Sequence, residues 1–315
     1  MRRLLISLPV LVGITFIAFA ALTLAPGDPL TARVDPSILA QQSPEWLEQR
    51  RHELGLDQPL PIRYARWLVS VVQGDLGYSI VSRRPIADEL ALRLPATLQL
   101  MGAALLIGMV VGVPAGVLSA VKQYAWPDYA LTGLSMATIS TPTFFLGMAA
   151  IYLFGVYLRI LPTADIATLG APPSLVDRLA HLVLPATILG LGNAAPLMRY
   201  TRASMLEVLR KDYMTTARAK GLQPLAILAG HGLRNALLPV LTVLGLLLPE
   251  LVAGAVVTEQ IFAWPGMGSM AVRAAADRDP SLLMGVVLVV GIGVLLSNLL
   301  TDLAYAAVDP RIRYR

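Results

Sequence analysis

Residues 94–121 read LPATLQLMGAALLIGMVVGVPAGVLSAV, and this stretch decides the class of fold. It contains no charged residue and is longer than the ~20 apolar residues with which a helix crosses a bilayer. A helix is expected because lipid offers no hydrogen-bond partner to an open strand edge. Gly108, Gly112 and Gly116 recur every fourth residue, so they share one helix face and predict close approach of a second helix. Pro114 lies between them and can kink the helix, which leaves a moving gate as an alternative to simple packing.

Five further apolar segments lie along the rest of the chain. The 315 residues are 56% hydrophobic and 14% charged, whereas about a quarter of the residues in a soluble domain are charged. We therefore predict an all-α membrane protein with one transmembrane domain over residues 1–315. Its six transmembrane helices are expected at residues 4–25, 94–121, 129–158, 182–203, 237–257 and 282–305.

The N-terminal segment, MRRLLISLPVLVGITFIAFAALTLAPGDP, has two interpretations. A cleaved signal peptide is one, with Ala18-Phe19-Ala20 as the processing site. The apolar run from Leu4 to Ala25 is longer than the ~7–15 residues of a signal-peptide core. We expect it to be retained as the first span.

The positions of the basic residues predict the orientation of the spans. If the spans alternate in direction, the basic residues of the short flanks all fall on one side, which is typically the cytoplasmic side. Both termini are therefore expected in the cytoplasm, and residues 26–93 outside it. That outer segment also contains arginines, but loops of ~60 residues or more contribute little to orientation. The cytoplasmic set is Arg2, Arg3, Lys122, Arg199, Arg202, Arg210, Lys211, Arg218, Lys220, Arg234, Arg311, Arg313 and Arg315.

The outer segment is expected to contain two short helices. One begins with Ser43 as a candidate N-cap and Pro44 at the first helical position, and includes Leu54 and Leu56. The other follows Pro61 and stops at Gly74. The two helices could pack over the outer mouth of the protein, or they could form a docking surface for an external partner.

Ionisable side chains within spans are costly in lipid and call for a reason. Glu250 follows Pro249 in the fifth span, and Glu259 ends that span. On an aqueous path, Glu250 would favour a cationic or amino-bearing solute; alternatively it is protonated or hydrogen-bonded to neighbouring helices. Glu250, Glu259 and Asn193 are our candidates for a translocation path.

Several kinds of chemistry have no motif in this chain. There is no cysteine, no phosphate-binding G-x-x-x-x-G-K-[ST] loop, no H-E-x-x-H and no G-x-S-x-G. His52, His181 and His231 are predicted far apart, so we expect neither a metal site nor a catalytic site, and no cofactor in this chain. The net charge of +5 could suit nucleic acid, but the basic residues flank the spans, so we expect membrane lipid and no nucleic acid.

The polar stretch YMTTARAKGLQP (213–224) lies between the fourth and fifth spans. Tyr213, either Thr216 or Ala217, and Lys220 share a helix face by their spacing. Gly221 can end that helix in a left-handed conformation, and Pro224 can start the next one. Upstream, Ser204 and Glu207 fit a capping box, unless the fourth span simply continues through them.

This stretch resembles the EAA loop of ABC-importer permeases, in the form found in peptide importers. Thr215, Thr216 and Ala217 occupy the Glu-Ala-Ala positions, Gly221 occupies the Gly position, and HGLRNALLP follows. Further motifs of the dipeptide/oligopeptide/nickel permease family run through nearly the whole chain. They are APGDP (25–29), GDLGYS (74–79), RLPATL (93–98), RYTRASMLEVL (199–209) and EQIFAWPGMG (259–268).

The resemblance implies a type I ABC-importer permease that contributes half of a translocation pathway. A second homologous permease would complete the pathway, two cytoplasmic ATPases would bind ATP and Mg²⁺, and an external binding protein would deliver short peptides. The residues implied to couple to an ATPase are Tyr213, Thr216, Ala217, Arg218, Ala219, Lys220 and Gly221. Nickel, glutathione-like or other small solutes are alternative substrates, and an ATP-independent channel or carrier is an alternative class. The expected location is the cytoplasmic (inner) membrane of a bacterium or archaeon.

Overall fold

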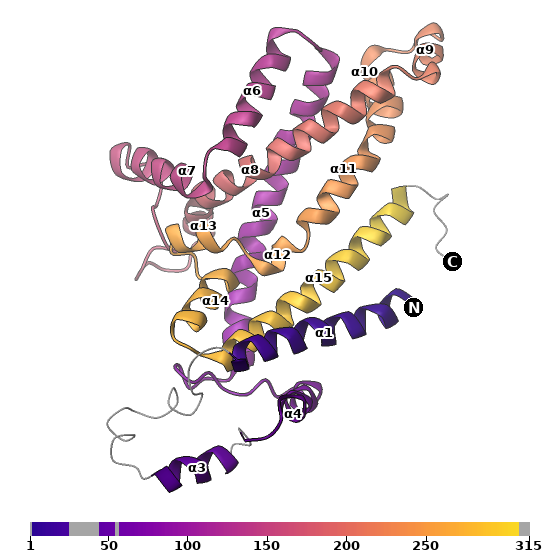
Figure 1. The fold of residues 1–315 in the computed structure, drawn as a ribbon. Helices are drawn as coiled ribbons and strands as arrows, with labels where there is room; N and C mark the ends of the chain where they lie inside the picture. Colours follow the sequence, from indigo (N-terminus) through magenta and orange to yellow (C-terminus); the bar gives the residue numbers. More distant parts are fainter. Residues whose placement is uncertain (1, 25–43, 54–56, 309–315) are drawn as a thin grey trace. The chain divides into compact units, whose positions relative to one another are not determined.

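The computed structural model describes residues 2–24, 44–53 and 57–308 (Figure 1). Within these ranges the regular structure is helical, apart from one isolated antiparallel bridge between Tyr78 and Pro85. The predicted all-α class is confirmed. The APGDP motif, the candidate N-cap Ser43, Leu54, Leu56 and the C-terminal arginines lie outside the described residues.

The chain divides into two compact units. The first comprises Met1–Leu94 with Met270–Ile292, and the second comprises Pro95–Ser269 with Gly293–Arg315. Three helices contribute to both units: α5 (Ile86–Val121), α14 (Met267–Ala276) and α15 (Pro280–Val308). That the whole chain acts as one transmembrane domain stays a prediction.

The first unit also contains α1 (Arg2–Leu24), α3 (Pro44–Glu53) and α4 (Leu60–Val72). α4 docks on the middle of α1 through Tyr64, which is 7% exposed. The Tyr64 hydroxyl donates to the Val12 carbonyl at 2.9 Å and lies 2.8 Å from the Thr15 hydroxyl. Phe16 and Phe19 meet the Tyr64 ring edge-on. The second outer helix thus packs against a span, whereas docking of an external partner stays a prediction.

Asp279 joins the GDLGYS motif to the start of α15 in this unit. The Asp279 carboxylate is buried and accepts from the Ser79 hydroxyl at 2.6 Å and from the Ile80 amide at 2.8 Å. Its other oxygen accepts from the Leu282 amide at 3.0 Å. A carboxylate at this position satisfies an amide in the first turn of α15, which has no partner within the helix.

The second unit is built from long helices and several short ones. Its elements are α6 (Trp126–Ser140), α7 (Thr143–Ala150), η1 (Ile151–Tyr157), α8 (Leu175–Leu209), α9 (Asp212–Ala219), α10 (Pro224–Ala226), η2 (Ile227–Leu233), α11 (Arg234–Leu247), α12 (Glu250–Ala253) and α13 (Val256–Ile261). The helices α6 and α11 both pack on α8.

The glycine stripe of α5 packs directly on α8. A Cβ atom at Gly108 would lie 2.8 Å from the Asn193 Cβ, and one at Gly112 would lie 2.5 Å from the Ala194 carbonyl oxygen. At Gly116 the corresponding distance to the Met198 carbonyl oxygen is 2.6 Å. The predicted close approach of a second helix is confirmed, since no side chain fits between these backbones.

Two of the predicted spans are broken in the structure. The third bends by 100° between Trp126–Ser140 and Thr143–Tyr157. Thr141 there has an extended backbone, as expected for a residue before proline. The fifth bends by 52° between Pro224–Leu237 and Pro239–Ala253. Among the described residues, four helices are long and apolar enough to cross a membrane, and six spans result if each bent pair counts as one.

The helices α5 and α8 extend well beyond the predicted spans. α5 begins at Ile86, with Asp88 and Glu89 in its first turn, where the helix dipole favours negative charge. α8 ends at Leu209, so the fourth span continues through Ser204 and the capping-box alternative is wrong. The Ser204 hydroxyl instead donates to the Ala236 carbonyl at 3.0 Å.

Candidate functional site

The polar loop after α8 forms a helix, a tight turn and a second helix, as predicted. Lys211 is extended and precedes α9, and Gly221 adopts a φ of +72° just after that helix ends. A left-handed residue at this position favours glycine, because a Cβ atom would be strained. Pro224 then occupies the first turn of α10, where its missing N–H costs nothing.

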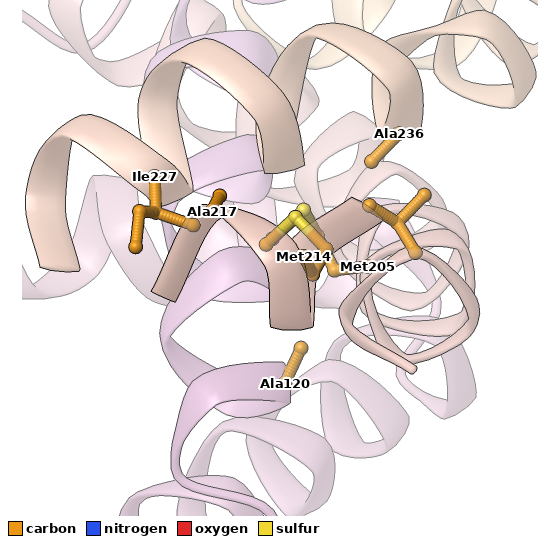
Figure 2. Packing of buried hydrophobic residues seen from close by; sticks show 7 residues of the cluster. Ala120, Met205, Met214, Ala217, Ile227 and Ala236 are labelled. Atoms are coloured by element: carbon orange, nitrogen blue, oxygen red, sulfur yellow. The ribbon is translucent and has the colours of Figure 1, made fainter. Parts of the chain in front are cut away.

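One face of α9 is anchored in an apolar cluster. Met214 is 1% exposed and Ala217 is 6% exposed. Figure 2 shows both side chains gathered with Met205, Ala120 and Ile227, which come from α8, α5 and η2. The position of α9 therefore depends on the long helices α5 and α8. A displacement of α9 should be transmitted to both of them.

The remaining face of α9 is open to solvent. Tyr213 is 40% exposed. Among the seven residues implied to couple to an ATPase, Ala217 alone is buried, and the other six are exposed. These six are Tyr213, Thr216, Arg218, Ala219, Lys220 and Gly221. We call these six residues the outer face of α9, where "outer" means that they face away from Met214 and Ala217 and does not refer to a side of the membrane. Lys220 and Gly221 follow the last residue of the helix directly.

The surroundings of the outer face are basic and partly apolar. Exposed Leu222 and Leu225 line a groove beside Arg218. At the end of α8, the Lys211 ammonium lies 2.9 Å from the Glu207 carboxylate, and this hydrogen bond raises the pKa of Lys211. The surface offers positive charge and exposed leucine side chains to another protein.

A buried ion pair joins α6 to α8. The Arg202 Nε and Nη2 atoms donate to the two carboxylate oxygens of Asp128, each at 2.8 Å. The Ser119 hydroxyl at the end of α5 also donates to Asp128. Asp128 is 2% exposed, so the charge of this carboxylate is stabilised by fixed donors in place of water. The network fixes the ends of α5, α6 and α8 together.

Two of the motifs found in the sequence meet in a second buried network. Glu259 is fully buried: one carboxylate oxygen accepts from the Thr97 hydroxyl at 3.1 Å and the other from the Ser269 amide at 2.7 Å. The indole of Trp264 donates to the Ala96 carbonyl at 2.8 Å. RLPATL and EQIFAWPGMG are therefore in contact through hydrogen bonds.

The family of the chain follows from comparison with known proteins. The family described as "Binding-protein-dependent transport system inner membrane component" matches residues 112–314, and its N-terminal counterpart matches residues 1–101. The chain belongs to this family. It is thus a permease subunit of a transport system and a multi-pass inner-membrane protein.

Two relatives show how far the similarity extends. The permease is 42% identical over 314 residues to the oligopeptide transport system permease protein AppB of Bacillus subtilis (strain 168), covering 99% of this chain and 98% of that one. It is 40% identical over 336 residues to the dipeptide transport system permease protein DppB of Escherichia coli (strain K12), covering 100% and 98%. Both alignments run from end to end.

A third relative carries a different name. The glutathione transport system permease protein GsiC of Escherichia coli O6:H1 is 40% identical over 314 residues, with 100% of this chain and 98% of the relative covered.

A solved structure shows the fold. The inward-facing MetNI methionine ABC transporter contains a chain that matches 70% of the permease and 96% of its own length, with a TM-score of 0.57 at 20% identity. The predicted type I ABC-importer permease fold is confirmed, with four to six spans in the described part of the chain, depending on whether each bent pair counts as one.

The three residues predicted for a translocation path lie in different surroundings. Glu259 is enclosed by the hydrogen bonds described above, and Asn193 is half-buried against the Gly108 backbone of α5. Glu250 is exposed. Their roles in translocation stay predictions.

Two of the three histidines lie in different surroundings. His181 is buried and hydrogen-bonded to the Ala164 carbonyl at 2.7 Å, whereas His231 is exposed. Among the described residues, no group of three or more His, Cys, Asp or Glu side chains could hold a metal ion.

The sequence did not single out three residues of the apolar cluster and of the two buried hydrogen-bond networks. Met214 is the anchor of α9, and Asp128 and Thr97 complete the two buried networks. Met214 could have been found, because it lies three residues before Ala217 and thus on the same helix face. Asp128 and Thr97 have partners 74 and 162 residues away, so no local pattern reveals them.

Proposed function

We propose that this permease forms half of the pathway of an ATP-driven importer for short peptides. A second homologous permease completes the pathway, two cytoplasmic ATPases hold ATP and Mg²⁺, and an external protein delivers the peptide. The names of two relatives that align over essentially the whole chain support peptides as the substrate class. The protein would lie in the cytoplasmic membrane of a bacterium or archaeon with both termini in the cytoplasm.

The construction of α9 carries this proposal. Met214 and Ala217 fix the helix to α5, α8 and η2, while its outer face remains exposed. A surface that is anchored on one side and open on the other can pass a displacement from a docked protein to the spans. In an importer, ATP binding would favour one global state of the spans and hydrolysis would release it.

A second substrate class is favoured by one observation. The 40% identity to a permease named for glutathione transport makes glutathione-like peptides the alternative. The external binding protein would decide between the two classes, because it presents the solute to the same pathway.

Reconstitution of the complete transporter tests the proposal. The permease, its second permease, the ATPases and the binding protein are placed in liposomes, and peptide uptake is measured together with ATP hydrolysis. We expect peptide-stimulated hydrolysis and uptake that needs every component. Uptake of peptide by this chain alone, without ATP, would contradict the importer and favour a carrier or channel.

A further inference from the structure

Glu250 lies where the fifth span loses its regular helix. α12 is a single turn that begins at Glu250 and ends before Gly254, which has a φ of +80°. Ala255 is also non-helical, with φ −101° and ψ 81°, and α13 starts only after it. Backbone that departs from a helix at membrane depth is tolerated where protein covers it or where it lines water.

Neighbouring helices cover some of the helix faces around Glu250 and leave one of them open. Val240 and Val243 are buried against Leu197 of α8. On another side, Gly245 packs so closely on Thr301 of α15 that a Cβ atom at position 245 would overlap with the Thr301 side chain. Leu246, one turn before Glu250, is 73% exposed. Leu246 and Glu250 thus share a face that neither α8 nor α15 covers.

The Glu250 carboxylate makes no hydrogen bond or ion pair with any residue that the structure describes. This distinguishes it from Glu259, whose two oxygens both accept hydrogen bonds inside the second unit. A carboxylate at the centre of a span costs about 3 kcal/mol when it faces lipid. The backbone break itself is covered by protein, because Gly254 packs against Glu259 and Thr97. The exposed and unpartnered Glu250 side chain, by contrast, faces water or another subunit.

We propose that Glu250 lines the aqueous translocation path and binds the protonated amino group of a passing peptide. A carboxylate only accepts hydrogen bonds, and an ammonium group only donates them, so the two groups are complementary. The neighbouring Leu246 gives the same face an apolar surface for a peptide side chain. This inference rests on the proposed peptide import and adds a specificity-determining residue to it.

The first test compares two peptides in the reconstituted transporter. One has a free amino terminus, and the other has the same sequence with an acetylated amino terminus and no lysine. In Glu250→Gln, which keeps the size and removes the charge, we expect uptake of the free peptide to fall about tenfold. Uptake of the acetylated peptide should change less than twofold, and Glu250→Asp should restore most uptake of the free peptide. Equal losses for both peptides, or no loss for either, would overturn the inference.

The second test measures the access of water to position 250 directly. The chain contains no cysteine, so Glu250→Cys introduces one unique thiol. We expect a positively charged, membrane-impermeant thiol reagent to modify it, and the free peptide with its binding protein to slow that modification. Ile17→Cys is the control, because Ile17 is 68% exposed in α1, whose apolar stretch is only 6% buried. Equal modification rates at both positions would overturn the inference.

These outcomes separate the inference from the proposed function. If wild-type transporter imports peptide and Glu250→Gln behaves as wild type, the path role of Glu250 fails and peptide import stands. If the wild-type transporter imports no peptide, the proposed function fails, and the role of Glu250 in peptide recognition fails with it.

Discussion

Single residues show how this chain keeps carboxylates inside an apolar protein. Asp128 is held by a bidentate guanidinium, and Glu259 is held by neutral donors from Thr97 and Ser269. In both cases the donors come from distant parts of the sequence, so each network fixes helix positions that apolar contacts alone would leave adjustable. Removing one partner should therefore cost more than the loss of a surface contact.

The Asp128–Arg202 pair is expected to contribute strongly to stability. Arg202→Met leaves a buried carboxylate without its cation and should destabilise the protein by about 3 kcal/mol, at the low end of the usual range because 27% of the Arg202 side chain is exposed. The double variant Arg202→Met with Asp128→Asn should lose less than the sum of the two single variants. Denaturant unfolding in detergent micelles measures these differences.

The exposed pair Glu207–Lys211 supplies the control for this experiment. Its side chains are 72% and 52% exposed, so Lys211→Met should change stability by less than about 1 kcal/mol. Strictly additive losses at Asp128 and Arg202 would show that the two residues do not act as a pair.

The hydroxyl of Thr97 has two partners in the Glu259 network. It donates to Glu259 at 3.1 Å and accepts from the Met267 amide at 2.7 Å. Thr97→Val keeps the shape but leaves both groups unsatisfied, so we expect a loss of about 1–3 kcal/mol. Thr138→Val is the matched control, because the exposed Thr138 hydroxyl bonds only to the Leu134 carbonyl of its own helix. Equal thermal midpoints for the two variants would contradict the role of Thr97.

At the scale of helices, the sequence predicts that a helix exists better than it predicts the length or the direction of that helix. The four-residue glycine spacing correctly predicts the contact face of α5, because that face follows from helix geometry alone. The sequence leaves two possible ends for α8, because Ser204 fits both a helix cap and a helix interior, and the structure shows that the helix continues to Leu209. The candidate site is likewise predicted only in part. Gly221 and Pro224 predict the turn. Which of Thr216 and Ala217 is exposed follows only from the structure, where Ala217 is buried on the same face as Met214.

The bend at Pro142 shows why direction is harder to predict. Proline explains the interruption, since the preceding Thr141 is driven to an extended conformation. The 100° angle between the two halves depends on contacts of α7 with α8 and α13. Such contacts join residues far apart in the chain, and single-sequence patterns do not specify them.

The α5–α8 contact gives a prediction with an internal control. Gly112→Ala places a Cβ atom 2.5 Å from the Ala194 carbonyl oxygen, and backbone cannot move aside as a flexible side chain can. We expect the free energy of unfolding to fall by about 1–3 kcal/mol, and less of the variant to assemble into the complete transporter. Gly102→Ala in the same helix meets nothing within 4 Å and should be neutral or up to about 1 kcal/mol more stable, because alanine favours helix. Similar stability of the two variants, measured by unfolding in detergent, would show that α5 and α8 do not pack this closely.

At the scale of the whole molecule, the outer face of α9 and the outer segment are predicted on opposite sides of the membrane. The first would face the ATPases in the cytoplasm, and the second would face the external binding protein. The two surfaces can be probed separately, because a chain without cysteine accepts single cysteines anywhere that is exposed.

Cross-linking from α9 should reach an ATPase subunit. Thr216→Cys and Lys220→Cys lie on the outer face and do not disturb the Met214 anchor. Labelled with a photoactivatable thiol reagent in the assembled transporter, both should form a covalent adduct with an ATPase, and ATP should change the yield because ATPase closure changes the contact. Tyr78→Cys is the control: Tyr78 is 65% exposed in the GDLGYS motif, so its thiol should react from outside intact cells and form no ATPase adduct. An ATPase adduct from position 78 would contradict the predicted orientation, and its absence from both positions of α9 would remove the coupling role of this helix.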